Sequence, residues 1–222
     1  MRQLQQRIGY QFLQPDLLER ALSHRSVGAK NNERLEFLGD AILGFEVADH
    51  LYHQVRDADE GQLSRMRAHL VKRETLAQVA REYDLGDILR LGPGELRSGG
   101  QTRDSILADA VEALIAAVYL DGGMEPARAL VRRLLGDRLT RLTPETRRKD
   151  PKTRLQEHLQ SMGRPLPRYE VVDVTGDQHD QRFRVTCSTG LVDDTQGEGS
   201  SRRKAEQSAA RHMLARLEET GA

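Results

Sequence analysis

The sequence predicts a multi-domain fold: an all-α domain over residues 1–143, a linker over 144–149 and an α+β domain over 150–222. Helical periodicity runs through the first domain without a strand pattern. The segment TPETRRKDP then contains two prolines and no apolar side chain, which is typical of a linker. Three short β-type runs follow between two helical segments, so the second domain has the order α-β-β-β-α.

The helices of the first domain are marked by residues that favour helix starts and stops. Proline is permitted in a first turn, and asparagine and threonine are favoured N-caps. We expect the run LGPGELRSGGQ at residues 91–101 to be a glycine-rich loop that stops helical periodicity. The expected helices are Pro15–His24, Asn31 or Asn32 to about Val55, Glu60 to about Tyr83 with a break near Lys72, Thr102 to Leu120 ended by DGG, and Pro126 to about Leu142.

The second domain is expected to place its helices on one face of a three-stranded sheet. Turns at Gly176–Asp177 and Thr189–Gly190 separate the strands. Cys187 falls within the second strand, where we expect it to pack as a small apolar residue. The expected elements are a helix over 152–163, strands over 168–176, 181–189 and 191–199, and a helix from about Ser201 to Glu218.

Composition indicates a soluble globular protein. Of the 222 residues, 37% are hydrophobic and 31% are charged, which is too apolar for a disordered chain. No run of about 18 apolar residues predicts a membrane span, and the N-terminus lacks the apolar core of a secretory signal. A single cysteine allows no internal disulfide. Together these features favour a cytoplasmic protein.

Charge is balanced in both domains. Residues 1–143 carry 20 basic and 21 acidic side chains, and residues 150–222 carry 11 and 12. The linker adds three basic and one acidic residue, so the net charge of the whole chain is zero. Any binding to phosphates must therefore come from local clusters rather than from a basic domain.

Three acids share one face of the helix that begins with NNERLEFLGD. At 100° per residue, Glu33, Glu36 and Asp40 fall within an arc of about 60°. On the opposite side we expect a core stripe made of Leu35, Leu38, Ile42 and Phe45. Beyond Asp40 the helix is apolar nearly all round, with Leu43 and Val47 on the acidic side, so it should be central and its acids partly enclosed.

A second acidic pair lies in the apolar run ILADAVEALIAAVYL. Asp109 and Glu112 are three residues apart and share a helix face. Buried carboxylates need compensation, either from a basic partner or from a divalent cation. The nearby bases His24, Arg25, Arg34 and Arg103 are outnumbered by acids, which favours a cation. Oxygen ligands suit Mg²⁺ or Mn²⁺, which can activate water and stabilise a leaving oxygen in phosphodiester hydrolysis.

Two alternatives to a Mg²⁺ or Mn²⁺ site stay open from the residues alone. Salt bridges would account for the acids if both helices found basic partners. A di-iron carboxylate bundle would require histidine three residues after glutamate, but Glu36 and Glu112 stand at those positions. His24 is expected to be a buried hydrogen-bonding residue rather than a catalyst. No Ser–His–acid or Cys–His arrangement stands out as a nucleophile.

Several motifs together resemble bacterial ribonuclease III over nearly the whole chain. These are NNERLEFLGDAIL at 31–43, HRS at 24–26, SRMRAHLV at 64–71 and the D-x-x-E pair at 109–112. The resemblance implies a homodimeric, Mg²⁺-dependent endoribonuclease that cuts double-stranded RNA. It also implies products with a 5′-phosphate, a 3′-hydroxyl and two-nucleotide 3′ overhangs. Ribosomal RNA precursors and some messenger or small RNAs would be the substrates.

The same resemblance assigns roles to the acids. It implies that Glu36, Asp109 and Glu112 bind the metal and that Asp40 and Glu112 are tied most closely to catalysis. Glu33 matches a supporting acid near the dimer interface. Phe37 matches an aromatic that packs into the partner subunit, although an ordinary core position is the alternative.

The second domain resembles the double-stranded RNA-binding domain. The resemblance implies minor-groove contacts from Thr153, Gln156 and Glu157 and from His179 in the turn GDQH. The start of the last helix would bind phosphate through Ser201, Arg202, Arg203 and Lys204. Asp177 and Glu206 depart from the family's usual proline and lysine, which is expected to weaken RNA affinity. A non-catalytic RNA-binding protein is the main rival interpretation, but such a protein would not need the acids.

Overall fold

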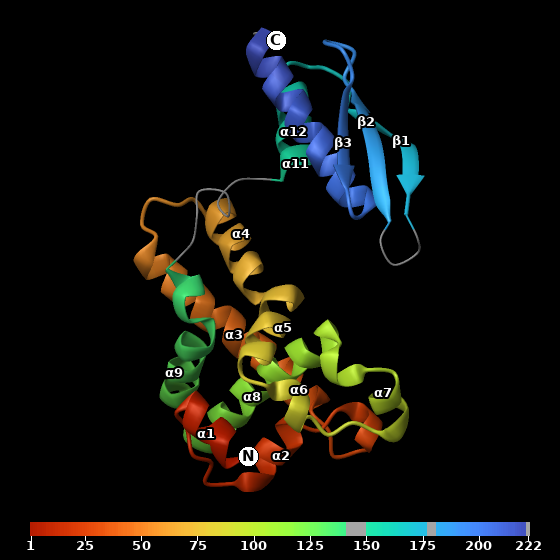
Figure 1. Ribbon diagram of the computed structural model, residues 1–222. Helices are drawn as coiled ribbons and strands as arrows, with labels where there is room; N and C mark the ends of the chain where they lie inside the picture. Colours follow the sequence, from red (N-terminus) through yellow and green to blue (C-terminus); the bar gives the residue numbers. More distant parts are fainter. Residues whose placement is uncertain (141–149, 177–180, 221–222) are drawn as a thin grey trace. The chain divides into compact units, whose positions relative to one another are not determined.

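The computed structural model describes residues 1–140, 150–176 and 181–220. The chain divides into two compact units, Met1–Arg148 and Lys149–Ala222. Figure 1 colours the first unit from red to green and the second from teal to blue. The predicted linker, residues 144–149, lies outside the described residues. No helix in the described ranges is long and apolar enough to cross a membrane.

The first unit is helical, as predicted. Its described residues form no strand, and one isolated bridge joins Ser23 to Arg90. The α-helices are α1 (Arg2–Ile8), α2 (Pro15–Ala21), α3 (Glu33–Gln54), α4 (Glu60–Val71), α5 (Arg73–Glu82), α6 (Leu85–Ile88), α7 (Pro93–Arg97), α8 (Asp104–Gly122) and α9 (Met124–Leu135). Short 3-10 helices cover Arg25–Val27, Gly100–Thr102 and Gly136–Leu139.

Helix α8 lies at the centre of this unit. It packs against α2, α3, α5 and α9, and most of its Ala, Val, Leu and Ile side chains are buried. A helix that is apolar nearly all round needs neighbours on every side, which α8 has. Its largest contact is with α3, the other helix that carries the predicted acids. The core therefore places the two acidic helices directly against each other.

Helix α3 begins at Glu33, directly after the two asparagines that were expected to cap it. Asn32 is the N-cap residue, but the Asn31 side-chain oxygen accepts the hydrogen bond from the Glu33 backbone N–H at 3.1 Å. The expected core stripe of this helix is wrong at one position, because Phe45 is 54% exposed. Leu35, Ile42, Leu43 and Val47 are buried. Since α3 is apolar on more than one side, periodicity alone could not tell which side faces the core.

Several helix boundaries differ from the sequence prediction. Helix α1 was not expected, α2 ends three residues early, and α9 begins two residues before Pro126 and ends at Leu135. The expected loop at 91–101 contains α7, which has a proline in its first turn. Thr102 does not cap α8: its hydroxyl donates to the Gly99 carbonyl at 3.0 Å, and Arg103 is the N-cap residue. The Thr102 hydroxyl thus forms its hydrogen bond within the preceding turn instead of capping α8.

The second unit is the predicted α-β-β-β-α fold. An antiparallel sheet in the order β1 (Arg168–Thr175), β2 (Arg182–Ser188) and β3 (Thr195–Gly199) carries α11 (Pro151–Ser161) and α12 (Arg202–Thr220) on one face (Figure 1). A bulge interrupts the register between Val171 and Asp173. Strand β3 begins later than expected, because Leu191 and Val192 pack against the core outside the ladder.

Two glycines let α12 lie close to the sheet. A β-carbon on Gly197 would lie 2.1 Å from the Ala209 nitrogen, and one on Gly199 would lie 2.6 Å from the Ala205 nitrogen. The alanines of α12 complete this close contact. Cys187 is fully buried in the core, as expected for a small apolar residue. The core of this unit comprises Leu155, Leu159, Cys187, Ala209, Ala210, Met213, Leu214 and Leu217.

Candidate functional site

Helices α3 and α8 meet at a glycine between the predicted acids. A β-carbon on Gly39 would lie 1.8 Å from the backbone oxygen of Glu112, a distance that no side chain can occupy. Any other residue would push the two helices apart. Gly39 therefore lets the carboxylates of α3 approach those of α8. Its role was not predicted from the sequence, although an isolated glycine inside a helical pattern is a known sign of close packing.

The crossing brings three of the predicted acids into one cluster. Carboxylate oxygens of Glu36, Asp109 and Glu112 all lie within 4.8 Å of one another, and each residue is half-buried. Asp40 and Glu33, on the same face of α3, are exposed. A cavity of about 270 Å³ opens beside the cluster, lined by Glu33, Glu36 and Asp109 among others. Oxygen ligands at this spacing suit a hard divalent cation.

Burial raises the pKa values of all three clustered acids, and repulsion between carboxylates adds to the shift at Glu36 and Glu112. Burial, followed by the charges of Asp40, Asp109 and Glu36, raises the pKa of Glu112 to about 8. Burial is also the main cause of the raised pKa of Glu36, followed by repulsion from Asp109 and Glu33. Glu112 therefore favours its protonated form at neutral pH, and a bound cation would favour the ionised form.

Burial likewise raises the pKa of Asp109, but nearby basic side chains oppose the shift. These are Arg73, His24 and Arg25, in order of effect. Arg73, at the start of α5, was not among the predicted residues. The sequence gives no sign of it because it lies 36 positions from Asp109 and becomes a neighbour only when α5 packs on α8.

The expected basic partners do not form salt bridges to the cluster. Among the described residues, no ion pair reaches Glu36, Asp109 or Glu112. Arg103 instead binds Glu95 at 2.5 Å, while Arg25 lies 3.8 Å from the exposed Glu33. Glu95 lines the cavity and was also absent from the sequence prediction. Salt bridging therefore does not account for the clustered acids.

His24 has the structural role expected for it. The side chain is 8% exposed, and its Nδ1 lies 2.9 Å from the Ser26 hydroxyl. The Ser26 oxygen also accepts from the Gly92 backbone N–H at 2.8 Å, which ties the HRS turn to the segment before α7. His24 and Arg25 of this turn line the acidic cavity.

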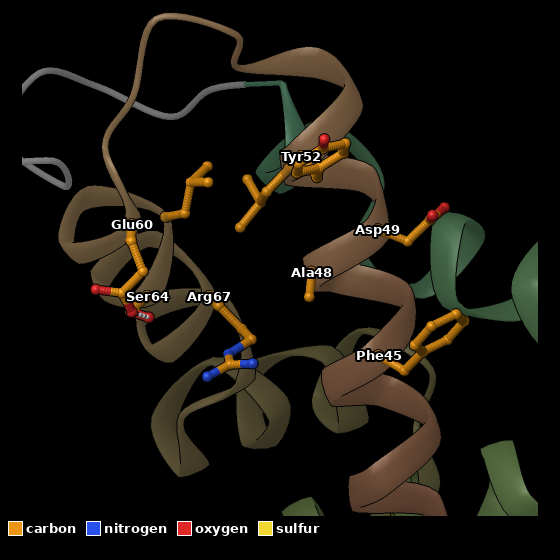
Figure 2. A pocket seen from close by; sticks show the side chains of 9 residues that line it. Phe45, Ala48, Asp49, Tyr52, Glu60, Ser64 and Arg67 are labelled. Atoms are coloured by element: carbon orange, nitrogen blue, oxygen red, sulfur yellow. Dashed lines mark hydrogen bonds between the residues drawn. The ribbon is translucent and has the colours of Figure 1, made fainter.

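Phe37 is not a core residue of its own chain, because its side chain is 81% exposed. It begins an apolar stripe along the outer face of α3. A pocket of about 450 Å³ lies at the far end of this stripe, between α3 and α4, and is lined by Phe45, Ala48, Leu51, Tyr52, Leu63 and Arg67 among others (Figure 2). The stripe consists of Phe37, Ala41, Gly44, Phe45, Ala48 and Tyr52.

The predicted RNA contacts of the second unit lie on exposed surfaces of its two helices. Thr153, Gln156 and Glu157 occupy one exposed face of α11, opposite the buried Leu155 and Leu159. The spacing of three and four residues explains their shared face.

The start of α12 presents the predicted basic cluster. The Ser201 hydroxyl accepts from the Lys204 backbone N–H at 3.3 Å, as an N-cap does, and Arg202, Arg203 and Lys204 are exposed. Glu206 is 8% exposed and forms ion pairs instead of joining the solvent-facing cluster. His179 and Asp177 lie outside the described residues.

Comparison with known proteins matches both units. Residues 14–139 match the "Ribonuclease-III-like" family model, and residues 151–217 match the "Double-stranded RNA binding motif" model. The chain is 60% identical over 217 residues to ribonuclease 3 of Alkalilimnicola ehrlichii, covering 97% of this chain and 95% of that protein. It is 57% identical over 215 residues to ribonuclease 3 of Pseudomonas paraeruginosa, covering 96% and 94%.

Solved structures of nuclease domains agree with these matches. Two structures of the nuclease domain of ribonuclease III from Campylobacter jejuni are 41% and 39% identical to this chain, with TM-scores of 0.60 and 0.61. They cover 61% and 64% of this chain and 96% and 98% of their own. With a helical nuclease unit, a clustered set of acids and an RNA-binding unit in one chain, the protein belongs to the ribonuclease III family of double-stranded-RNA endoribonucleases.

Proposed function

We propose that the acidic cluster hydrolyses both strands of duplex RNA with the help of Mg²⁺, for which Mn²⁺ can substitute. The products would carry a 5′-phosphate, a 3′-hydroxyl and two-nucleotide 3′ overhangs. One observation carries this proposal: three half-buried carboxylates gather within 4.8 Å without an ion pair among the described residues. Folding brings these acids together against their own repulsion, which a bound cation would relieve.

The proposed roles follow from the positions of the acids. Glu36, Asp109 and Glu112 would hold the cation, which when bound activates water and stabilises charge on the phosphate. Asp40 repels the Glu112 carboxylate, so a cation bound there would be stabilised by both acids. Glu112 must lose its proton before its oxygens can act as ligands, so cation binding is expected to release protons. Exposed Glu33 would support the site from its rim.

The apolar stripe on α3 supports a homodimer. Its residues are arranged symmetrically, because Phe37 and Tyr52, Ala41 and Ala48, and Gly44 and Phe45 lie equally far from one midpoint. Two α3 helices packed antiparallel about a two-fold axis at that midpoint would place each Phe37 opposite the partner's Tyr52. The pocket between α3 and α4 would then receive the aromatic ring of the partner's Phe37 (Figure 2).

A relative supports this assembly as well. One Campylobacter structure is described as showing structural flexibility in the region involved in dimer formation of its nuclease domain. A dimer of this chain would carry two acidic clusters, one for each strand of a duplex. The small residues Ala41, Gly44 and Ala48 would let the two helices approach closely at the axis.

The second unit would supply affinity for the duplex. Thr153, Gln156 and Glu157 would reach minor-groove hydroxyls, as would His179, while Ser201, Arg202, Arg203 and Lys204 would bind phosphates. Such contacts read the shape of A-form RNA rather than its sequence. We place the enzyme in the cytoplasm, with ribosomal RNA precursors and some messenger or small RNAs as substrates.

Cleavage of a defined RNA hairpin tests the proposed reaction. The full chain is incubated with end-labelled hairpin in Mg²⁺, in Mn²⁺ and in EDTA, and the ends of the products are mapped. We expect staggered cuts in both strands with Mg²⁺ or Mn²⁺ and no cuts in EDTA. Binding without cleavage under all three conditions would instead support the rival, a non-catalytic RNA-binding protein. Metal analysis of the purified protein would exclude a di-iron centre if no iron is found.

A further inference from the structure

Glu206 is buried at the junction of the two helices that carry the proposed RNA contacts. Its Oε2 accepts from Lys152 Nζ of α11 at 2.5 Å, and its Oε1 accepts from Arg202 Nε of α12 at 2.9 Å. Burial acts to raise the pKa of Glu206, but the hydrogen bonds and charges of these two bases outweigh burial and lower it. The carboxylate is therefore ionised and paired on both sides.

Lys152 is held by a second contact. Its Nζ lies 4.6 Å from the centre of the Tyr169 ring, a cation–π arrangement. Asp150 caps α11 through the Lys152 backbone N–H at 2.9 Å, and its other oxygen accepts from the Gln207 side chain. Two polar ties thus join the first turn of α11 to the first turns of α12.

These ties matter because the sheet anchors only one of the two helices closely. Gly197 and Gly199 let α12 lie against β3, whereas the main packing partner of α11 is α12. The position of the α11 surface relative to the basic start of α12 therefore depends on contacts between the two helices. Lys152–Glu206–Arg202 is an ionic contact that joins the first turn of α11 to the basic start of α12.

We propose that Glu206 is a positioning residue for duplex RNA, which joins α11 to α12 and fixes the spacing of their RNA-contacting surfaces. This role rests on the RNA contacts proposed above. Duplex RNA is recognised by shape across successive grooves, so contacts from two helices help only when their spacing matches the duplex. Glu206 also orients Arg202, whose guanidinium uses one of its five N–H donors on the carboxylate.

The proposal and simple electrostatics predict opposite effects of Glu206→Lys on RNA binding. Glu206→Lys adds positive charge beside phosphate-binding residues, so charge alone would tighten RNA binding and steepen its salt dependence. If Glu206 positions the helices, the same change places Lys152, Arg202 and a third cation together and binding weakens. Glu206→Gln, which keeps the shape of the side chain, should weaken binding less.

The test measures the dissociation constant of the full chain for a duplex of about 16 base pairs or longer, in EDTA, over a range of KCl concentrations. We expect about tenfold weaker binding for Glu206→Lys and about threefold weaker binding for Glu206→Gln. Glu218→Gln is the matched control, because Glu218 also joins α12 to α11 but lies 3.7 Å from Arg154 and is 70% exposed. It should leave binding unchanged.

Two further measurements separate positioning from loss of structure. Circular dichroism reports whether each variant is folded. If Glu206→Lys does not fold, the binding of Glu206→Gln provides the test. Cleavage in Mg²⁺ should show a raised KM with kcat nearly unchanged, since the acids of the other unit are intact. Tighter binding by Glu206→Lys with a steeper salt slope would overturn the proposal. The binding measurement needs no metal, so it gives a result even if the proposed cleavage reaction is wrong.

Discussion

Glu112 of the first unit and Glu206 of the second are both enclosed acids, but of these two only Glu206 has ion-pair partners among the described residues. Glu112 shares its site with Glu36 and Asp109, and its pKa rises to about 8. Glu206 is more deeply buried in its unit, yet its two basic partners lower its pKa. The raised pKa of Glu112 reflects burial beside other carboxylates, whereas the lowered pKa of Glu206 reflects its two basic partners. This difference separates a candidate reaction centre from a structural tie.

Neutralising Glu112 is the strongest test of this contrast. We expect Glu112→Gln and Asp40→Ala to reduce RNA cleavage by roughly three orders of magnitude or more, the scale of losing a group that stabilises the transition state. Duplex RNA binding should stay nearly unchanged, because the second unit is untouched. Cleavage rates in Mg²⁺ and dissociation constants in EDTA provide the two measurements. Wild-type turnover by Glu112→Gln would refute the proposed mechanism.

Separating the acids by distance should have the next largest effect. Gly39→Ala places a methyl group where the Glu112 carbonyl oxygen lies, so α3 and α8 must shift apart. We expect a loss of about 1–3 kcal/mol in unfolding free energy together with reduced cleavage. Gly61→Ala in α4 is the control, since its nearest contact, at 3.1 Å, is the flexible Arg65 guanidinium. Urea denaturation measures both variants, and equal stability of Gly39→Ala and wild type would contradict the close crossing.

The opposite pKa shifts predict opposite dependences of stability on pH. Between 4.5 and about 8 the folded state binds a proton at Glu112 more tightly than the unfolded state does, so stability should fall as pH rises through this range. Glu206, with a lowered pKa, contributes stability above its unfolded-state pKa and loses it as pH falls through the folded value.

Thermal unfolding between pH 4 and 9 checks both signs. In EDTA, Glu112→Gln should reduce the fall in melting temperature as pH rises. Glu206→Gln should reduce the fall in melting temperature as pH is lowered. Added Mg²⁺ should reduce the decline in the wild-type chain, because a bound cation favours the ionised acids. A wild-type melting temperature that rises steadily from pH 5 to 8 in EDTA would show that ionisation of the acid cluster does not destabilise the fold.

The sequence predicted the fold and the acids because both follow local periodicity. Glu33, Glu36 and Asp40 share a helix face by spacing alone, as do Asp109 and Glu112, and the α-β-β-β-α order follows from alternating runs. The role of Gly39 was not predicted, because it depends on which face of α3 meets α8. The outward position of Phe45 depends on the same choice between two apolar faces.

The pairing of Glu206 was hidden from the sequence for a different reason. Lys152 lies 54 positions away, and nothing in the run SSRRKAEQ indicates that one charged residue turns inward while three face outward. Comparison with the family's usual lysine suggested only weaker RNA affinity from this position. Charge partners across a fold become visible when packing is known, whereas partners on one helix follow from spacing.

The smallest expected effect compares two neighbouring arginines at the start of α12. Arg202 is held by Glu206, while Arg203 is exposed and has no ion pair among the described residues. Arg203→Ala should lower the slope of log Kd against log salt by about one unit, as for one lost phosphate contact. Arg202→Ala should lower the slope similarly but weaken binding more, because a side chain already held in place loses less entropy on binding. Equal effects of the two substitutions on affinity would mean that pairing with Glu206 gives Arg202 no advantage.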